Sequence, residues 1–234
     1  MNRFVHLFLL LLPLLSFAQV TKITYRFEIP VDESVAADYY GEVKRRELKD
    51  VFKYTDFELV FDSKQSKYYS PSIMESDKIP FREAASYLDI DKPVYADSGY
   101  RYYYGSENMG VDEPYLVKSP LYVWQLHKDT KTIAGYKCYK ATYTWPGFKG
   151  VGPTHTAWYC PDIKSRFGPM GMGNLPGAIL QFEYGGYVHT ATKVAFNVKE
   201  KIDFPIATKV ITEEEYHKIW DEWEIREMGK TFRE

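Results

Sequence analysis

The chain has 234 residues, a formal net charge of −2 and a hydrophobic content of 45%. A nearly neutral chain without a long basic segment does not attract polyanions, so nucleic acid and anionic membrane surfaces are excluded as expected partners. Aromatic residues make up 17% of the sequence, with 21 tyrosines. This content is typical of β-structure with half-buried faces.

Residues 1–18 have the pattern of a secretory signal peptide. Arg3 is positively charged, residues 7–15 are apolar, and Ser16 to Ala18 form a small-x-small cleavage site. The apolar run is shorter than the about 20 residues that a membrane-spanning helix needs. A retained membrane anchor is the alternative. We expect cleavage after Ala18 and an exported protein, periplasmic or secreted, without a transmembrane anchor.

The mature chain is expected to form a single β-rich domain over residues 19–234. Alternation of apolar and polar residues predicts strands in four segments of its first part, residues 21–29, 52–62, 99–106 and 115–127. Residues 70–97 contain several prolines and are interpreted as an excursion from the sheet, with a short helix around residues 81–88. Residues 128–135 are rich in turn-forming residues and predict a link to the next strand.

Three further segments have the composition of strands, residues 135–145, 154–160 and 178–196. The last of them is interrupted by Gly185-Gly186, which predicts a two-residue hairpin turn. Meandering strands at this spacing predict a mainly β fold of the α+β type, with a large curved antiparallel sheet or half-barrel and a C-terminal helix.

The C-terminal helix has a clear start signal. Thr212 and Glu215 form a capping box, and Ile211 with Tyr216 fits a hydrophobic staple. Gly229 predicts the end of the helix. Between the start and the end of the helix, apolar residues recur at helical spacing, namely Tyr216, Ile219, Trp220 and Trp223. This stripe either packs the helix on the sheet, or it binds a partner or plugs a cavity.

The two cysteines, Cys138 and Cys160, lie on either side of a loop framed by Trp145 and Pro153. A hairpin centred on Lys149 places the cysteines directly opposite each other, with Cβ atoms about 4.5–5.5 Å apart. This distance and an oxidising compartment predict a disulfide bond. The alternatives are two buried free thiols, or a register shifted by one residue that turns the cysteines to opposite faces.

The same register collects aromatic side chains on the other face of this hairpin. We interpret that face, together with Trp124, as a candidate ligand-binding wall. Ordinary core packing is the alternative. The wall consists of Trp124, Tyr139, Tyr143, Trp145, His155 and Tyr159.

Residues 167–182 concentrate glycine and proline before an apolar strand. Their G-x-G-x-x-x-G spacing differs from the dinucleotide-binding pattern and no helix follows, so a phosphate site is not expected. Pro176 and Gly177 fit the central positions of a type II turn that begins the strand. Met170 and Met172 have a spacing compatible with copper(I), although gap-filling packing is the alternative.

Ordered landmarks between residues 121 and 180 resemble the GLPGLI family of exported bacterial proteins. They include Trp124, the run TKTIAGYKCYKA, Trp158-Tyr159 and the motif residues Gly168, Pro169, Asn174, Leu175, Pro176, Gly177 and Ile179. Asn174 stands at the first glycine of the family hexapeptide and Ala178 at its second leucine. Asparagine tolerates left-handed backbone well, so the role of the motif as a structural turn can survive. Cys160 stands where the family more often has another residue.

The resemblance implies no particular activity. The strand-rich pattern of the family is similar to the half-barrels of periplasmic lipoprotein carriers, which hold acyl chains in a concave sheet. The four histidines of the mature chain show no zinc-binding spacing, and no catalytic residue, metal or cofactor is predicted. We therefore expect a non-enzymatic periplasmic protein that binds a lipid-like or small apolar ligand, or an envelope protein.

Two other functions are compatible with the sequence. The first is an accessory protein of outer-membrane transport, which would act through an edge strand or the C-terminal helix and have no ligand cavity. The second is an unrecognised hydrolase, which would need convergent polar groups around His155 or His189.

The disulfide predicted between Cys138 and Cys160 can be tested by intact mass. We expect the protein purified from an exporting cell to gain no alkyl groups when treated with iodoacetamide in denaturant, and to gain two after reduction. Two alkylated thiols in the unreduced protein would contradict the prediction.

Overall fold

The computed structural model describes residues 19–31, 40–74, 79–88, 90–105, 113–145, 152–205 and 209–231. The signal peptide predicted for residues 1–18 lies outside the described residues. The strands are β1 (Thr21–Glu28), β2 (Asp56–Phe61), β3 (Gln65–Tyr69), β4 (Val94–Asp97), β5 (Tyr100–Tyr104), β6 (Leu116–Pro120), β7 (Gln125–Ile133), β8 (Tyr136–Thr144), β9 (Thr154–Cys160), β10 (Ala178–Tyr184), β11 (Tyr187–Ala195) and β12 (Val210–Thr212). The helices are α1 (Tyr40–Phe52), α2 (Pro71–Met74), α3 (Ile79–Tyr87) and α4 (Glu213–Thr231), with a short 3-10 turn, η2 (Pro169–Gly171).

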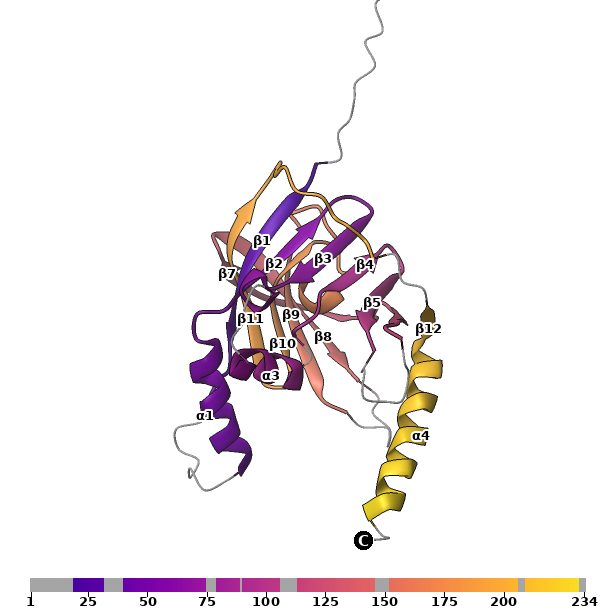
Figure 1. Ribbon diagram of the computed structural model, residues 1–234. Coiled ribbons are helices and arrows are strands. Elements are labelled where there is room, and N and C mark those ends of the chain that lie inside the picture. Colours follow the sequence, from indigo (N-terminus) through magenta and orange to yellow (C-terminus); the bar gives the residue numbers. More distant parts are fainter. Residues whose placement is uncertain are drawn as a thin grey trace, which may run out of the picture.

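All twelve strands belong to one curved sheet, in the order β12-β6-β5-β4-β3-β2-β1-β11-β10-β9-β8-β7 (Figure 1). Neighbouring strands are antiparallel except for β12 and β6, which are parallel. The predicted fold class, a mainly β protein with a large curved sheet and a C-terminal helix, is confirmed. The predicted turn at Gly185-Gly186 is also confirmed, because both glycines have positive φ angles, 55° and 80°, between β10 and β11.

Some local predictions were wrong or incomplete. Residues 128–135 are not a link, since most of them continue strand β7 as far as Ile133. Residues 70–97 contain α2 and the predicted helix, now α3, but they end in strand β4. Helix α1 was not predicted; its Leu48 and Phe52 are buried in the core. Figure 1 shows α1 and α3 side by side at one end of the sheet.

The central strands of the sheet share one inner face. Directly paired residues share a face, and the pairs Tyr25 with Phe57 and Phe27 with His189 connect these strands. This central part of the inner face is mainly apolar. The Tyr25 hydroxyl donates a hydrogen bond of 2.6 Å to the carbonyl oxygen of Ile179. The main core cluster, which also contains Leu48 and Phe52, packs against this face.

The sheet has two arms, one that contains β4, β5 and β6 and one that contains β10, β9, β8 and β7, and these arms approach each other. Strands β6 and β7 lie in opposite halves of the strand order, yet only residues 121–124 separate them in the chain. Trp124 of this connection donates its indole N–H to the carbonyl oxygen of Gly173 at 2.7 Å. Asn174 donates its side-chain amide to the carbonyl oxygen of Tyr122 at 3.1 Å. The connection is therefore tied to the chain between β9 and β10.

The chain between β9 and β10, residues 161–177, is the glycine-rich segment. It is held against β10 by a hydrogen bond of 3.3 Å that the Ile179 N–H donates to the carbonyl oxygen of Phe167. It also reaches the opposite arm, because Arg166 donates to the carbonyl oxygen of Ser98 at 2.9 Å. A Cβ atom at Gly171 would lie 2.8 Å from Val94 Cγ1. The segment thus joins the β9–β10 arm to the β4–β5 arm, and its fit at Gly171 requires the absence of a side chain.

The prediction of a type II turn at Pro176-Gly177 was wrong. The φ angle of Gly177 is 159°, whereas the third position of that turn needs about +80°. Gly177 is required for close approach, since a Cβ atom there would lie 2.2 Å from the carbonyl oxygen of Cys160. Asn174 has a φ angle of 70°, so it does adopt the left-handed backbone that its residue type tolerates.

The start of α4 agrees with its sequence signal. The backbone N–H of Thr212 donates to Glu215 at 2.7 Å, and the N–H of Glu215 donates back to the Thr212 hydroxyl at 3.2 Å. Tyr216 and Ile219 pack on a small cluster that contains Ile211. The helix continues past Gly229 to Thr231 and extends away from the sheet (Figure 1).

The hairpin register predicted from the cysteine spacing is confirmed. Tyr139 pairs with Tyr159 and Thr144 with Thr154, as a loop centred on Lys149 requires. Cys138 and Cys160 are buried free thiols in this structure, and the disulfide stays a prediction. Burial and the neighbouring Cys160 raise the pKa of the Cys138 thiol to about 12, which makes the reduced form a poor nucleophile.

The close approach at Gly177 can be separated from its backbone conformation by a matched pair of variants. Gly177→Ala places a Cβ atom against the backbone of Cys160. Gly135 has a positive φ angle of 84°, and a Cβ atom there would contact no atom within 4 Å. We expect Gly177→Ala to lower the free energy of unfolding by about 2 kcal/mol or more beyond Gly135→Ala. Equal losses in urea unfolding would show that the close approach is unimportant.

Candidate functional site

The structure brings most of the predicted aromatic wall together. Tyr139 and Tyr159 are paired across β8 and β9, and their ring centroids are 6.1 Å apart. Tyr143 pairs with His155 in the same way, at 6.3 Å. Trp124 contacts Tyr143 from the β6–β7 connection, with centroids 6.2 Å apart.

Trp145 lies beyond the last residue of β8, where its backbone N–H donates to Pro153 at 3.1 Å. The wall is not the lining of an open interior, because Met172 and Leu175 of the glycine-rich segment pack against it. Tyr139, Tyr143 and Trp124 remain partly exposed. The aromatic wall is therefore a packed, half-exposed surface.

Arg101 is the residue that sequence reasoning missed. It lies on β5 opposite Ser119 of β6, on the inner face of the sheet. Its guanidinium carbon is 5.1 Å from the ring centroids of both Tyr103 and Tyr122. Nη2 forms an ion pair of 3.6 Å with Oε1 of Glu213, the first residue of α4. The available signal was an arginine at an inward-facing position of a tyrosine-rich strand.

Tyr122 connects Arg101 to the aromatic wall. Its ring stacks on Tyr143, with centroids 4.0 Å apart and planes 11° from parallel. Tyr143 in turn lies beside His155. We call these five residues, Arg101, Ser119, Tyr122, Tyr143 and His155, the arginine–aromatic site. Its members come from β5, β6, β8, β9 and the β6–β7 connection.

Three polar atoms of the site have no hydrogen-bond partner among the described residues: Arg101 Nε, Ser119 Oγ and His155 Nδ1. Ser119 is fully buried and His155 is 3% exposed. Most buried polar atoms in folded proteins are hydrogen-bonded, and an unpaired one costs about 1–3 kcal/mol. A group of unpaired donors at one place is therefore a mark of a binding site.

The charges of the site are set by burial. Burial lowers the pKa of His155 below its usual value, and the positive charge of Arg101 lowers it further. Burial raises the pKa values of Tyr122 and Tyr143. At neutral pH the imidazole and both phenols are therefore uncharged, and Arg101 is the charged member of the five-residue site.

His189 belongs to the core and not to the arginine–aromatic site. Its Nδ1 is 2.6 Å from the Tyr68 hydroxyl, and its ring lies 4.9 Å from Phe27 and 5.5 Å from Phe57. Phe182 pairs with His189 and also lies 6.3 Å from His155. The two histidines share a face, but an aromatic ring lies between them.

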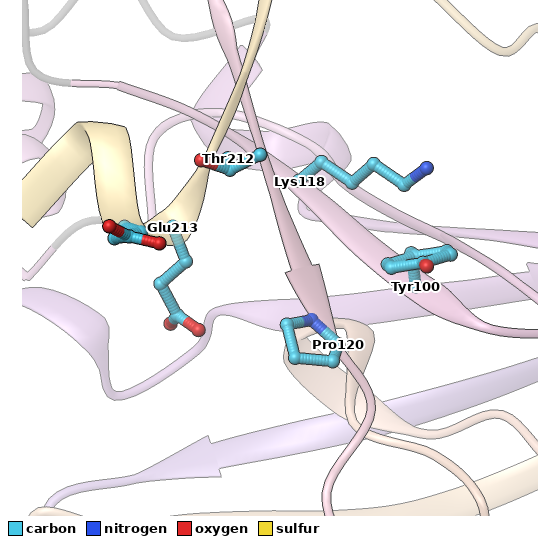
Figure 2. Close-up of a pocket in the computed structure, with 6 residues that line it drawn as sticks. Tyr100, Lys118, Pro120, Thr212 and Glu213 are labelled. Atoms are coloured by element: carbon cyan, nitrogen blue, oxygen red, sulfur yellow. The ribbon is translucent and has the colours of Figure 1, made fainter.

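A hollow of about 390 Å³ lies beside the site, on the opposite face of β5 and β6. Its walls are Tyr100, Lys118, Pro120, Thr212, Glu213 and Glu214 (Figure 2). The Lys118 ammonium lies 3.8 Å from the Tyr100 ring centroid, so this charge already has an aromatic partner. Glu213 is shared between the hollow and the arginine–aromatic site.

Other kinds of site find no support in the described part of the chain. No group of three or more histidine, cysteine, aspartate or glutamate residues there could hold a metal ion. None of its helices is long and apolar enough to cross a membrane.

Comparison with known proteins gives a likeness in solved structures alone. No family model matches the chain, and no curated protein matches it. Two crystal forms of a protein named PNGF-II are similar, with TM-scores of 0.54 and 0.53 and identities of 16% and 17%. The alignments cover 87% of this chain, and 34% and 33% of the PNGF-II chain. The chain spans about a third of the length of that protein. The likeness is one of fold.

The buried His189 makes stability depend on pH. Burial lowers its pKa from 6.5 to about 3, so on acidification the unfolded chain binds a proton before the folded protein does. The free energy of unfolding should therefore fall by about 1.4 kcal/mol per pH unit below pH 6.5 on account of this residue. The buried His155 adds to the loss in the same direction.

We expect His189→Gln to reduce this slope, measured by urea unfolding between pH 7 and pH 5. Val123→Ala, at a position that is 82% exposed and has no ionisable group, is the control and should leave the slope unchanged. An identical slope for His189→Gln and the wild type would show that His189 is not the source.

Proposed function

We propose that the protein binds an apolar or amphipathic ligand at the arginine–aromatic site and is not an enzyme. The observation that supports this is the combination of unpaired buried polar atoms with half-exposed aromatic rings. Ligand sites are typically lined by aromatic side chains with a few polar groups that fix orientation. The resemblance to exported bacterial proteins makes the periplasm the proposed location.

The interior of the sheet near the aromatic wall is filled, so the ligand is not proposed to lie there. The glycine-rich segment and the aromatic rings fill the inner face near β9 and β10, as the contacts of Met172 and Leu175 show. We therefore place the ligand against the partly exposed rings of Tyr122, Trp124 and Tyr143, and not inside the curved sheet. These side chains supply apolar area, and Arg101 with Ser119 supplies the polar end.

Contact with an envelope protein through α4 is the second candidate. Its support is the exposure of large apolar side chains beyond the packed first turns, since Trp220 is 40% and Ile225 69% exposed. The ring of Trp220 lies 5.6 Å from that of Trp223. A hydrolase is less well supported. Among the described residues no serine, threonine or cysteine forms a hydrogen bond with His155 or His189, and the Tyr68 hydroxyl bonded to His189 is buried in the core.

The proposed binding can be measured by calorimetric titration with decanol and with decanoate. We expect at least one of the two to bind, and Tyr143→Ala to weaken binding by roughly three- to tenfold through loss of a stacked ring. Tyr54→Ala, which removes a tyrosine that is 84% exposed in the α1–β2 turn, should leave binding unchanged.

Absence of binding by both amphiphiles, together with a bare polypeptide mass for the protein purified from the exporting cell, would overturn the proposal. Equal effects of the two tyrosine substitutions would place the ligand elsewhere. Thermal unfolding of each variant shows whether the fold is retained.

A further inference from the structure

We propose that the ligand carries an anionic oxyacid head, a carboxylate or a phosphate monoester, which Arg101 binds together with Ser119. This inference rests on the proposed function and names the class of ligand. It is carried by a largely buried guanidinium whose Nε has no hydrogen-bond partner among the described residues.

The donors of Arg101 point to an anion. A guanidinium has five N–H groups in a planar fork that matches the two oxygens of a carboxylate or phosphate. Nε of Arg101 is buried and has no hydrogen-bond partner among the described residues. Its ion pair with Glu213 spans 3.6 Å, which is longer than a hydrogen bond. With the Arg101 side chain only 16% exposed, most of the fork is out of water as well.

Ser119 and His155 complete the polar end of the site. Ser119 pairs with Arg101 across β5 and β6, so its hydroxyl lies on the same face and can donate to an oxyanion. His155 is neutral at neutral pH because burial and Arg101 lower its pKa, and its Nδ1 is unpartnered. The positive charge at this end therefore comes from Arg101 alone.

The rings around Arg101 favour an amphiphile over a free anion. Tyr103 and Tyr122 flank the guanidinium, and Tyr122 continues by stacking into Tyr143. A small anion would use the donors but leave this aromatic surface unused. An alkyl or ring-bearing tail attached to the anion would cover it and remove apolar area from water.

Glu213 competes with a bound anion for the Arg101 guanidinium. Its carboxylate is held near Arg101 by the start of α4, at a distance that gives attraction without a hydrogen bond. A bound oxyacid that approaches to hydrogen-bond distance replaces this weaker contact. Glu213→Gln should therefore strengthen the binding of an anionic amphiphile and leave the binding of a neutral one unchanged.

The test compares decanoate, decyl phosphate and decanol by calorimetry, with acetate and inorganic phosphate as tail-free controls. We expect decanoate or decyl phosphate to bind at least tenfold more tightly than decanol. Acetate and inorganic phosphate should bind more weakly than decanoate and decyl phosphate. Arg101→Met, which keeps the apolar stem, should abolish the preference for the anion. Arg101→Lys should retain part of it, and Glu213→Gln should increase it.

The outcomes separate this inference from the proposed function. Equal affinities for decanol and decanoate, unchanged by Arg101→Met, would overturn the anionic head but leave a ligand site. Binding of acetate or inorganic phosphate as tight as that of decanoate would show a free-anion site. Absence of binding by every amphiphile would overturn the proposed function itself. If Arg101→Met fails to fold, Glu213→Gln provides the same test, because it should strengthen the binding of decanoate and leave that of decanol unchanged; equal changes for the two ligands would overturn the anionic head.

Discussion

The glycine-rich segment between β9 and β10 is the constraint on which the arrangement of this protein depends. An open sheet of twelve strands has two free edges, and backbone hydrogen bonding along the sheet does not by itself bring them together. The segment links the β9–β10 side of the sheet to the β4–β5 side by direct contact. It is fixed to β10 at Ile179, to Ser98 beside β5 through Arg166, and to the β6–β7 connection through Gly173 and Asn174.

These contacts explain the composition of the segment. Gly171 lies against Val94 and Gly177 against the backbone of Cys160, at separations that leave no space for a Cβ atom. Asn174 takes a left-handed conformation and uses its amide to hold Tyr122 in place. The glycine-rich segment thus has an architectural role, and it holds Tyr122, which contacts both Arg101 and Tyr143.

The joining of the arms also determines the chemistry of the site. Arg101 and His155 lie on strands that are seven places apart in the sheet. Burial lowers the pKa of His155, and the positive charge of Arg101 lowers it further. With Ser119 of β6, these residues bring together a cation, a hydroxyl and an imidazole whose buried polar atoms have no partner among the described residues, next to aromatic rings that are partly open to solvent.

Features that depend on near neighbours in the chain could be predicted from the sequence. The capping box at Thr212, the hairpin at Gly185-Gly186 and the register that pairs Tyr143 with His155 all follow from residue spacing. Arg101 could not be assigned to the site, because its partners Tyr122 and Glu213 are brought to it by long-range packing. The conformation of Gly177 was also missed, since its contact with Cys160 overrides the preference of the Pro-Gly pair for a type II turn.

A crystal structure of the protein with decanoate would show whether the arginine–aromatic site is a ligand site. We expect a carboxylate within hydrogen-bond distance of the Arg101 guanidinium and of Ser119 Oγ, with the alkyl chain against Tyr122 and Tyr143. Decanoate bound instead in the hollow beside Lys118 or along α4, with the Arg101–Glu213 contact unchanged, would contradict it.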